Sequence, residues 1–412
     1  MDTFMTWMTE KVGPKSEQIA RNPWVAGIKH AIDVILPFIL VGSLVTVYGV
    51  VRNFLPSLPD LKPISTYTFG LIGLFMAFLI PYFIMENKKQ DKNKFIAGIT
   101  GLALFLMIVK PEVTDAGYLF QISSFGAGGM FVSIVSGLFV SLVMLLYGKF
   151  SFFKEDSMMP SFIQQWFNSL LPIFTCVFIG WLIVIQLNFD LFTFIQSLFE
   201  PLTKIAQTYP GMLLLGLLPV VFYTLGISSW VFTPILAPIS LAAIAANVDA
   251  GANNIFCDEV VFTFIALGGR GCTLALNFLM LKCKSTKYKV LGKTCLGPGI
   301  LNINEPLMFG TVAFNPMLML PCWLICIVTT TITYFSMKFG LVPIPHAVFS
   351  MWYCPIFLSG FFVSGLAGVL LTLVNFVLSG LIWYPFLKVA DRQQLELEAN
   401  AEDDDEDEDE DY

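Results

Sequence analysis

Long apolar stretches alternate with short charged segments along the whole chain. A bilayer core about 30 Å thick is crossed by about 20 apolar residues in a helix. The first half of the chain contains five stretches near that length, namely Ala31–Val51, Tyr67–Met85, Phe95–Val109, Gly129–Tyr147 and Phe167–Leu187. This pattern predicts five simple transmembrane helices joined by charged loops.

The apolar stretches of the second half are interrupted. Gly211–Ala246 carries no charge but holds several prolines, which predicts two spans with a break near Gly226–Ser229. Val260–Leu281 is a further span, interrupted by a Gly-Gly-Arg-Gly run. Cys295–Phe335 and Ala347–Leu387 are too long for one crossing, so each predicts a re-entrant hairpin followed by a full span.

The first hairpin, called hairpin one below, is expected at Cys295–Val312, and the second at Pro345–Gly365. Together these elements predict an all-α polytopic membrane protein with about ten transmembrane helices and two re-entrant hairpins. Non-helical backbone at membrane depth persists only where it is buried in protein or lines a wet cavity, and transporters often place their substrate there. We therefore expect a scaffold and dimerisation domain in residues 1–200 and a substrate-binding transport domain in residues 211–390.

Composition agrees with a lipid environment, because 56% of the residues are hydrophobic and only 13% are charged. Soluble domains carry about 25% charged residues. The formal net charge of −7 arises from Glu402–Asp411, which holds ten acids; without them, 20 acids face 23 bases. Such a run repels itself and buries no apolar area, so residues 396–412 are predicted to form a disordered acidic tail.

The distribution of basic residues predicts the topology. Lys and Arg concentrate in short loops on the cytoplasmic side of a membrane. If the N-terminus lies inside and each span crosses once, most of the 23 basic residues fall on the inner side, including those of Lys88–Lys94 and Lys282–Lys293. The outer side receives Arg52, Lys62, Lys110, Lys204 and Lys338. The sequence thus predicts a multi-pass protein of the cell membrane with both termini in the cytoplasm.

Glu305 is the main candidate for chemistry, because it is the one charge within Cys295–Phe335. A carboxylate at membrane depth costs several kcal/mol unless it is paired, protonated or hydrated, which marks it as a functional candidate. Asn302, Asn304 and Asn315 lie around it, and amides both donate to and accept from sugar hydroxyls. We therefore expect a sugar site at this hairpin. The structural alternative is that Glu305 holds the hairpin together by accepting hydrogen bonds from its backbone N–H groups.

Four further residues are candidates for substrate contact. Arg270 lies among glycines inside a predicted span, where a structural ion pair with Glu305, Asp258 or Glu259 competes with a role in binding. The other three are Ser228, Trp230 and Trp352, which lie at predicted breaks. An indole offers a flat face to a sugar ring, but it serves equally well in packing or as an interfacial anchor.

Several chemistries are not indicated by the sequence. There is no Walker A motif for ATP hydrolysis, and the scattered cysteines do not form a zinc or redox motif. No metal, cofactor or nucleic-acid partner is expected. The chain is predicted to act as a conduit for a small solute.

Residues 301–321, LNINEPLMFGTVAFNPMLMLP, resemble the characteristic segment of one family of sugar carriers. The family comprises the membrane (IIC) subunits of the phosphoenolpyruvate-dependent sugar phosphotransferase system, of the lactose/cellobiose/diacetylchitobiose type. The resemblance continues through GGRGCTLALNFLML and KCKSTKYKVLGK, to YPF at Tyr384–Phe386 and GSL at Gly42–Leu44, and covers roughly residues 20–390.

The resemblance implies a homodimer formed through the first five spans and an elevator-like motion of the second half. It also implies that a cytoplasmic IIB protein transfers phosphate from its own cysteine to the bound sugar. Glu305 corresponds to the family's glutamate that contacts sugar hydroxyls, where a carboxylate could orient the accepting hydroxyl or take its proton. The chain itself carries no phosphoryl group, so it would act as the membrane component of a sugar phosphotransferase.

Three places differ from the family pattern. One is the aromatic-threonine-proline pattern of the second hairpin, which is Trp352-Tyr353-Cys354-Pro355 here. The family's glycine-isoleucine-histidine run is Gly226-Ile227-Ser228 here, and Arg270 stands where a small or hydroxyl residue is usual. The leading hypothesis is a permease that translocates a β-linked disaccharide or similar sugar and presents it to IIB. The alternatives are an uncoupled transporter of another, possibly anionic, solute and a sugar-binding membrane sensor.

Overall fold

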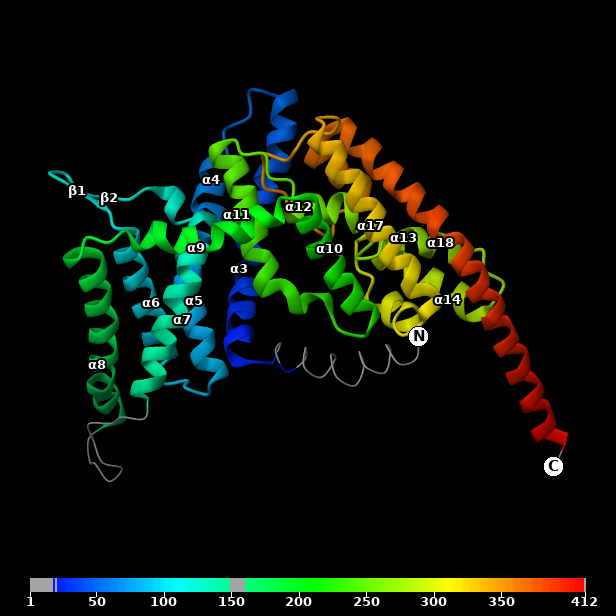
Figure 1. Cartoon of the computed structure of the whole chain (residues 1–412), viewed down its shortest axis with the longest axis horizontal. Coiled ribbons are helices and arrows are strands. Elements are labelled where there is room, and N and C mark those ends of the chain that lie inside the picture. The colour runs from blue at the N-terminus through cyan, green and yellow to red at the C-terminus, as the bar shows by residue number, and fades with distance from the viewer. Residues whose placement is uncertain (1–17, 19–20, 149–159, 411–412) are drawn as a thin grey trace. The chain divides into compact units, whose positions relative to one another are not determined.

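The computed structural model describes residue 18, residues 21–148 and residues 160–410. Within that part, the regular elements are helices apart from one two-stranded sheet. The chain divides into two compact units (Figure 1). The N-terminal unit comprises Glu17–Lys204 and Thr233–Ala252, and the unit that we call the site unit comprises Ile205–Phe232 and Asn253–Tyr412.

The N-terminal unit is a bundle of apolar helices centred on α5 (Ile72–Asn87), which packs against α3 (Pro23–Phe54), α6 (Lys94–Val109) and α7 (Met130–Tyr147) (Figure 1). Its remaining helices and strands are α4 (Lys62–Tyr67), β1 (Glu112–Thr114), β2 (Gly117–Leu119), α8 (Ser161–Trp181), the π-helix η5 (Leu182–Gln186), α9 (Leu191–Ala206) and α11 (Thr233–Ala250). Three 3₁₀ turns complete it, η2 (Phe69–Leu71), η3 (Ile122–Ser124) and η4 (Ala127–Gly129).

Small residues allow close helix contact in this bundle. A Cβ atom built on Gly101 of α6 would lie 2.3 Å from the carbonyl oxygen of Ala77 in α5, so only glycine permits this approach. Membrane helices use small residues in this way, because van der Waals contact replaces the hydrophobic effect between them. Conversely, Leu170, Phe174 and Phe178 of α8 are exposed apolar side chains. An apolar outer surface is what a lipid environment requires.

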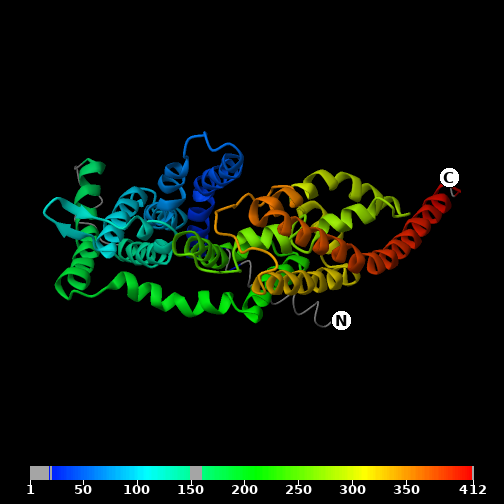
Figure 2. The same ribbon diagram turned by 90° about the horizontal axis from the view of Figure 1, so that it is seen from above.

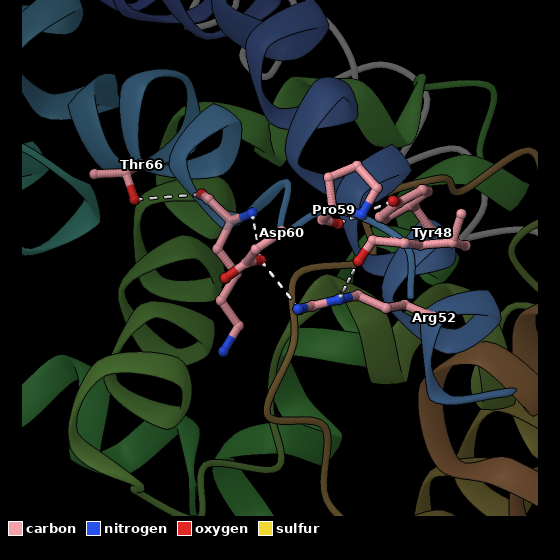
Figure 3. A network of polar contacts seen from close by, with 7 residues as sticks. Tyr48, Arg52, Pro59, Asp60 and Thr66 are labelled. Atoms are coloured by element: carbon pink, nitrogen blue, oxygen red, sulfur yellow. Dashed lines mark hydrogen bonds and ion pairs between the residues drawn. The ribbon is translucent and has the colours of Figure 1, made fainter. Parts of the chain in front are cut away.

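The loop after α3 is held by polar contacts at the helix end (Figure 3). The hydroxyl of Tyr48 donates to the carbonyl of Pro59 at 2.9 Å, and Nε of Arg52 donates to the carbonyl of Leu58 at 3.0 Å. Arg52 also forms an ion pair with Asp60 at 3.4 Å. Asp60 accepts in turn from the backbone N–H of Lys62, which begins α4. These contacts fix the direction of the chain between α3 and α4.

The site unit combines three long helices with a series of short ones. Helix α17 (Pro316–Lys338) packs along α18 (Ile356–Glu410) and against α10 (Tyr209–Thr224) (Figures 1 and 2). The short elements are the 3₁₀ turn η6 (Ser229–Phe232), α12 (Asp258–Val260), the π-helix η7 (Val261–Ile265), α13 (Thr273–Met280), α14 (Thr286–Thr294), α15 (Leu296–Ile300), α16 (Glu305–Leu307) and the π-helix η8 (Met308–Val312).

A polar cap followed by proline begins two of the long helices. The side chain of Asn22 accepts from the backbone N–H of Trp24 at 3.0 Å, and Pro23 is the first residue of α3. The same arrangement starts α17, where Asn315 accepts from Met317 at 3.1 Å and Pro316 follows. The cap satisfies an N–H group that has no partner within the helix, while proline at the first position loses none. Sequence thereby sets where these helices start.

Carboxylates of α18 cap the N-terminus of α14. Asp391 accepts from the backbone N–H groups of Lys284 and Ser285, both at 3.0 Å. Glu398 accepts from those of Thr286 and Lys287, at 2.9 and 3.0 Å. Negative charge is favourable at the positive end of a helix dipole, and all four N–H groups would otherwise have no partner in the helix. The end of α18 therefore holds the lysine-rich segment before hairpin one.

The helical membrane fold agrees with the sequence prediction, but the predicted count of ten spans is not confirmed. Among the described residues, seven helices are long and apolar enough to cross a membrane, or eight if α9 and α10 form one bent span. Helix α6 has the predicted position but only 16 residues. Residues 260–281, predicted as one span, are instead short helices and turns.

Three predictions concern segments that the structure describes only in part. The N-terminus, which the topology prediction places inside, and the last two residues of the tail lie outside the described residues. The backbone of α18 continues as helix to Glu410 through most of the acidic segment, and its disorder stays a prediction. The compact units group Thr233–Ala252 with the N-terminal half, while the roles of scaffold and transport domain stay predictions.

Candidate functional site

The segment around Glu305 is a helix–turn–helix rather than a continuous helix. Helix α15 ends in a left-handed residue, Asn302, whose φ is 60°. The N–H of Asn302 bonds to the carbonyl of Gly299, and that of Ile303 bonds to the carbonyl of Pro298. This pair of bonds is the Schellman arrangement that closes a helix end, and asparagine tolerates the left-handed conformation. Glu305 then begins α16 after the turn.

Asn302 joins three segments of the site unit. Its Oδ1 accepts from the backbone N–H of Gly268 at 2.6 Å, and its Nδ2 donates to the carbonyl of Trp352 at 2.6 Å. The side chain is buried, with 6% exposed. A buried amide whose donor and acceptor are both used resists displacement, because each lost bond leaves a polar atom without a partner. Asn302 therefore holds the turn after η7 and the second predicted hairpin against the first.

Asn304 has a similar position on the other side of the turn. Its Nδ2 donates to the carbonyl of Arg270 at 3.0 Å and to Oγ1 of Thr273 at 2.9 Å. Its Oδ1 accepts from the hydroxyl of Tyr223 at 3.2 Å. These bonds connect α10, the start of α13 and hairpin one, and they fix the backbone immediately before Glu305.

Glu305 lies beside Trp230, which packs in turn against Trp352. Nε1–H of Trp230 donates to Oε1 of Glu305 at 3.3 Å. The rings of Trp230 and Trp352 pack edge to face, with centroids 5.7 Å apart and planes at 68°. Within the described part of the chain, the second carboxylate oxygen of Glu305 accepts no hydrogen bond, and its side chain is only half-buried. A carboxylate oxygen and indole faces thus occur together, as a sugar requires.

Ser228 supports the turn that carries Trp230. Its Oγ accepts from the backbone N–H of Trp230 at 3.4 Å, and its carbonyl accepts from Val231 at 3.2 Å. A hydroxyl that caps a short 3₁₀ turn sets the direction of the next side chain. Ser228 is therefore next to the Trp230–Glu305 pair, and its predicted contact with substrate stays a prediction.

Arg270 lies in a turn with unusual backbone. Gly268, Gly269, Gly271 and Cys272 all have positive φ, between 53° and 100°. The guanidinium of Arg270 lies over the ring of Phe262, 5.6 Å from its centroid. Among the salt bridges of the described residues none involves Arg270, so the predicted ion pair with Glu305 is not seen.

Arg270 also lines a small cavity in the site unit. The cavity has a volume of about 10 Å³, and Met212, Gly216 and Cys326 contribute to its wall. This volume holds a single water molecule at most. A sugar therefore does not fit in this cavity, and the role of Arg270 in substrate binding stays a prediction.

The structure thus brings most of the predicted site residues into one connected group. Asn302, Trp352, Trp230 and Glu305 are linked in this order by the bonds and the ring contact described above, and Asn304 directly precedes Glu305 in the chain. Asn315 is instead the cap of α17. The sequence analysis missed Tyr223 and Thr273, and it treated Glu259 only as a possible partner for Arg270. For Tyr223 and Thr273, the sequence offered one indication, a hydroxyl group inside an apolar stretch.

Residues 29–326 match the protein family described as "Phosphotransferase system, EIIC". This match covers more than half of the chain. The chain belongs to that EIIC family. The prediction of a phosphotransferase sugar permease subunit is thereby confirmed at the level of the family, and neither of the two alternatives finds support. It follows that this EIIC chain is a multi-pass membrane protein.

Relatives of this EIIC chain extend over nearly its whole length. It is 29% identical to the "Lichenan permease IIC component" of Bacillus subtilis, over 94% of both chains. It is 27% identical to the "PTS system cellobiose-specific EIIC component" of Geobacillus stearothermophilus, over 96% of both chains. It matches 72% of the "PTS system lactose-specific EIICB component" of Staphylococcus haemolyticus, at 27% identity.

The fold of this EIIC chain also matches a solved structure. The crystal structure of the transporter ChbC, the IIC component from the N,N'-diacetylchitobiose-specific phosphotransferase system, superposes with a TM-score of 0.87. The match covers 95% of this chain and 99% of ChbC, at 27% identity. The predicted polytopic helical fold is confirmed by this agreement.

Proposed function

We propose that this EIIC chain translocates a β-linked disaccharide or a similar sugar and presents it to a cytoplasmic IIB protein for phosphorylation. The observation that supports the sugar site most strongly is Glu305, a carboxylate that follows a broken helix and accepts a bond from Trp230, whose ring packs against that of Trp352. The names of several relatives refer to cellobiose, lichenan and lactose, which supports a sugar of this class.

The two carboxylate oxygens of Glu305 would have different roles. Oε1 is held by the N–H of Trp230, so the carboxylate has a fixed orientation. The other oxygen would accept a hydrogen bond from the sugar hydroxyl that receives phosphate. As the sugar oxygen bonds to phosphorus, the bond from phosphorus to the carrier's cysteine sulfur breaks, and Glu305 accepts the hydroxyl proton. Phosphoryl transfer depends mostly on positioning, which such a fixed carboxylate provides.

The two tryptophans would hold the sugar ring in place. The apolar face of a sugar packs on an indole, while its hydroxyls need donors and acceptors at the edge. Trp230 and Trp352 meet edge to face, so together they offer surfaces in two directions beside Glu305. Ser228 would contribute a hydroxyl at the same place.

We further propose the organisation that the family resemblance implied. Both termini would lie in the cytoplasm, since most basic residues then fall on the inner side. Residues 1–200 would form the scaffold of a homodimer, and the exposed apolar side chains of α8 offer such a surface. Residues 211–390 would carry the sugar by an elevator-like motion. Chemical cross-linking in membranes tests the dimer, and labelling of single cysteines from either side tests the topology.

The function is tested with membrane vesicles supplied with IIB and the energy-coupling proteins. A panel of labelled sugars should identify one that accumulates in phosphorylated form. Glu305→Gln should retain folding and insertion but lower phosphorylation at least about a hundredfold, as expected for loss of a proton acceptor. Glu200→Gln is the matched control, because Glu200 is an exposed carboxylate paired with Lys204. Full activity of Glu305→Gln, or accumulation of unmodified sugar, would contradict the proposal.

A further inference from the structure

A second carboxylate of the site unit is more deeply buried than Glu305. Glu259 in α12 is 1% exposed. Its Oε1 accepts from the backbone N–H of Phe349 and from Oγ of Ser350, both at 3.2 Å. Within the described residues, its Oε2 is buried and has no hydrogen-bond partner. Glu259 thus contacts a segment about 90 residues further along the chain, and it does so through one oxygen only.

Packing alone does not explain this residue. Burying a carboxyl group is unfavourable unless its polar atoms are satisfied, and an apolar side chain of the same size would fill the space without that cost. The salt bridges of the described residues include none to Glu259. A buried polar group that is only partly satisfied requires another reason for its presence. Its two bonds to residues 349 and 350 are the available reason.

These bonds lead directly to the sugar site. The segment from Phe349 to Trp352 forms no helix or strand, so its conformation depends on such contacts. The carbonyl of Ser350 accepts from the backbone N–H of Trp352 at 3.0 Å. The carbonyl of Trp352 accepts from Asn302. The segment is therefore held by Glu259 at its start and by Asn302 at its end.

We propose that Glu259 is a positioning residue for Trp352, the indole on which the sugar packs. Glu259 does not touch the sugar; it fixes residues 349 and 350 so that the Trp352 ring meets Trp230 beside Glu305. The inference rests on the proposed function, because it assigns Trp352 a part in sugar binding. The acceptor oxygen is the feature that matters, since both bonds to Glu259 are donated to one atom.

Two substitutions at position 259 distinguish the hydrogen-bond acceptor of the side chain from its contribution to packing. Glu259→Gln keeps an acceptor oxygen at the same reach and should bind sugar within about twofold of the unchanged protein. Glu259→Met keeps the length but accepts no comparable bond, and should weaken sugar binding about tenfold or more, as expected for loss of one or two hydrogen bonds. Thr372→Val removes another buried hydroxyl of this unit that has no partner among the described residues, and should leave affinity unchanged.

A double-mutant cycle makes the test specific to Trp352. If Glu259 acts through this ring, Glu259→Met should have no further effect on sugar affinity in a Trp352→Ala background. Binding to the purified full chain is measured by titration with the sugar that the vesicle panel identifies. A Glu259→Met protein that binds like the unchanged protein, or two losses that add fully in the double variant, would overturn the inference.

Two safeguards keep the outcome decisive. If Glu259→Met does not fold, Ser350→Ala removes one of the two bonds and should weaken binding about threefold; unchanged binding would then reject the inference. If the unchanged protein binds no sugar at all, the proposed function fails instead. The two failures are therefore distinguishable.

Discussion

Nε1–H of Trp230 donates to Oε1 of Glu305 at 3.3 Å, although 75 residues separate the two in the sequence. The bond orients the carboxylate and leaves its second oxygen for another donor. It also couples an indole from the 3₁₀ turn η6 to the acid of hairpin one. A charged acceptor held by one protein donor is well suited to recognise a hydroxyl, because its orientation is set before the ligand arrives.

Removing this bond should affect chemistry more than affinity. Trp230→Phe retains an aromatic face but lacks the N–H group, so Glu305 loses its fixed orientation. We expect phosphorylation of bound sugar to slow about tenfold, as for loss of a hydrogen bond to a charged group, while KM changes by less than about threefold. Steady-state phosphorylation in vesicles measures both. Trp166→Phe on α8 is the control. A rise in KM with unchanged kcat would show that the ring face, not the N–H, is what matters.

A Cβ atom at position 269 should disrupt the site. Gly269 has a φ of +100°, and an added Cβ would lie 2.3 to 2.6 Å from the side-chain amide of Asn304. Gly269→Ala should therefore abolish sugar binding and lower the melting temperature. Gly340→Ala has a comparable left-handed φ of +73° but open space, so it should cost only about 1 kcal/mol and leave binding intact. Equal effects of the two variants would refute the predicted clash.

Replacing the Nδ2 donor of the Asn304 side chain should lower the stability of the protein. Asn304→Asp replaces Nδ2 by an oxygen that faces the carbonyl of Arg270, so an acceptor meets an acceptor. We expect a loss of stability of about 2–3 kcal/mol, the cost of unsatisfied buried polar groups. Tyr223→Phe removes a single bond to the same amide and should cost about 1 kcal/mol. Urea unfolding in detergent measures both; a smaller effect of Asn304→Asp than of Tyr223→Phe would contradict this assignment.

The cap of α14 should be detectable by hydrogen exchange. Asp391→Ala and Glu398→Ala each remove acceptors for backbone N–H groups of residues 284–287. Loss of a helix cap costs about 1 kcal/mol, which corresponds to roughly fivefold faster exchange of these amides. Glu396→Ala on the same helix is the control. Unchanged exchange in both cap variants would show that α14 is held by packing alone.

Much of the helical plan follows from local sequence. The stretches Ala31–Val51 and Gly129–Tyr147 lie within α3 and the η4–α7 segment, because a long apolar run without charges has few other stable forms in lipid. The starts of α3 and α17 follow from asparagine before proline. The small sheet of β1 and β2 was not predicted; its strands of three residues are too short to show a pattern.

The broken region was harder to predict, because its structure depends on contacts between distant residues. Counting apolar residues predicts Val260–Leu281 as one span. In the structure, four residues with positive φ around Arg270 interrupt the helix. The sequence places Asn302 and Asn304 close to Glu305 along the chain. The sequence could not show that the side-chain amides of Asn302 and Asn304 are hydrogen-bonded to backbone groups. Those groups belong to Gly268, Arg270 and Trp352, which are 34 to 50 residues away in the chain.

The two hydrogen bonds of the Asn302 side chain bear on how the sugar preference of such carriers can change during evolution. Both partners are main-chain atoms, the N–H of residue 268 and the carbonyl of residue 352. Any side chain at position 352 would present the same carbonyl, so the ring that we propose to face the sugar can be exchanged without loss of the bond from Asn302. A new sugar preference can thus arise by single replacements there, while the architecture that orients the acid stays unaltered.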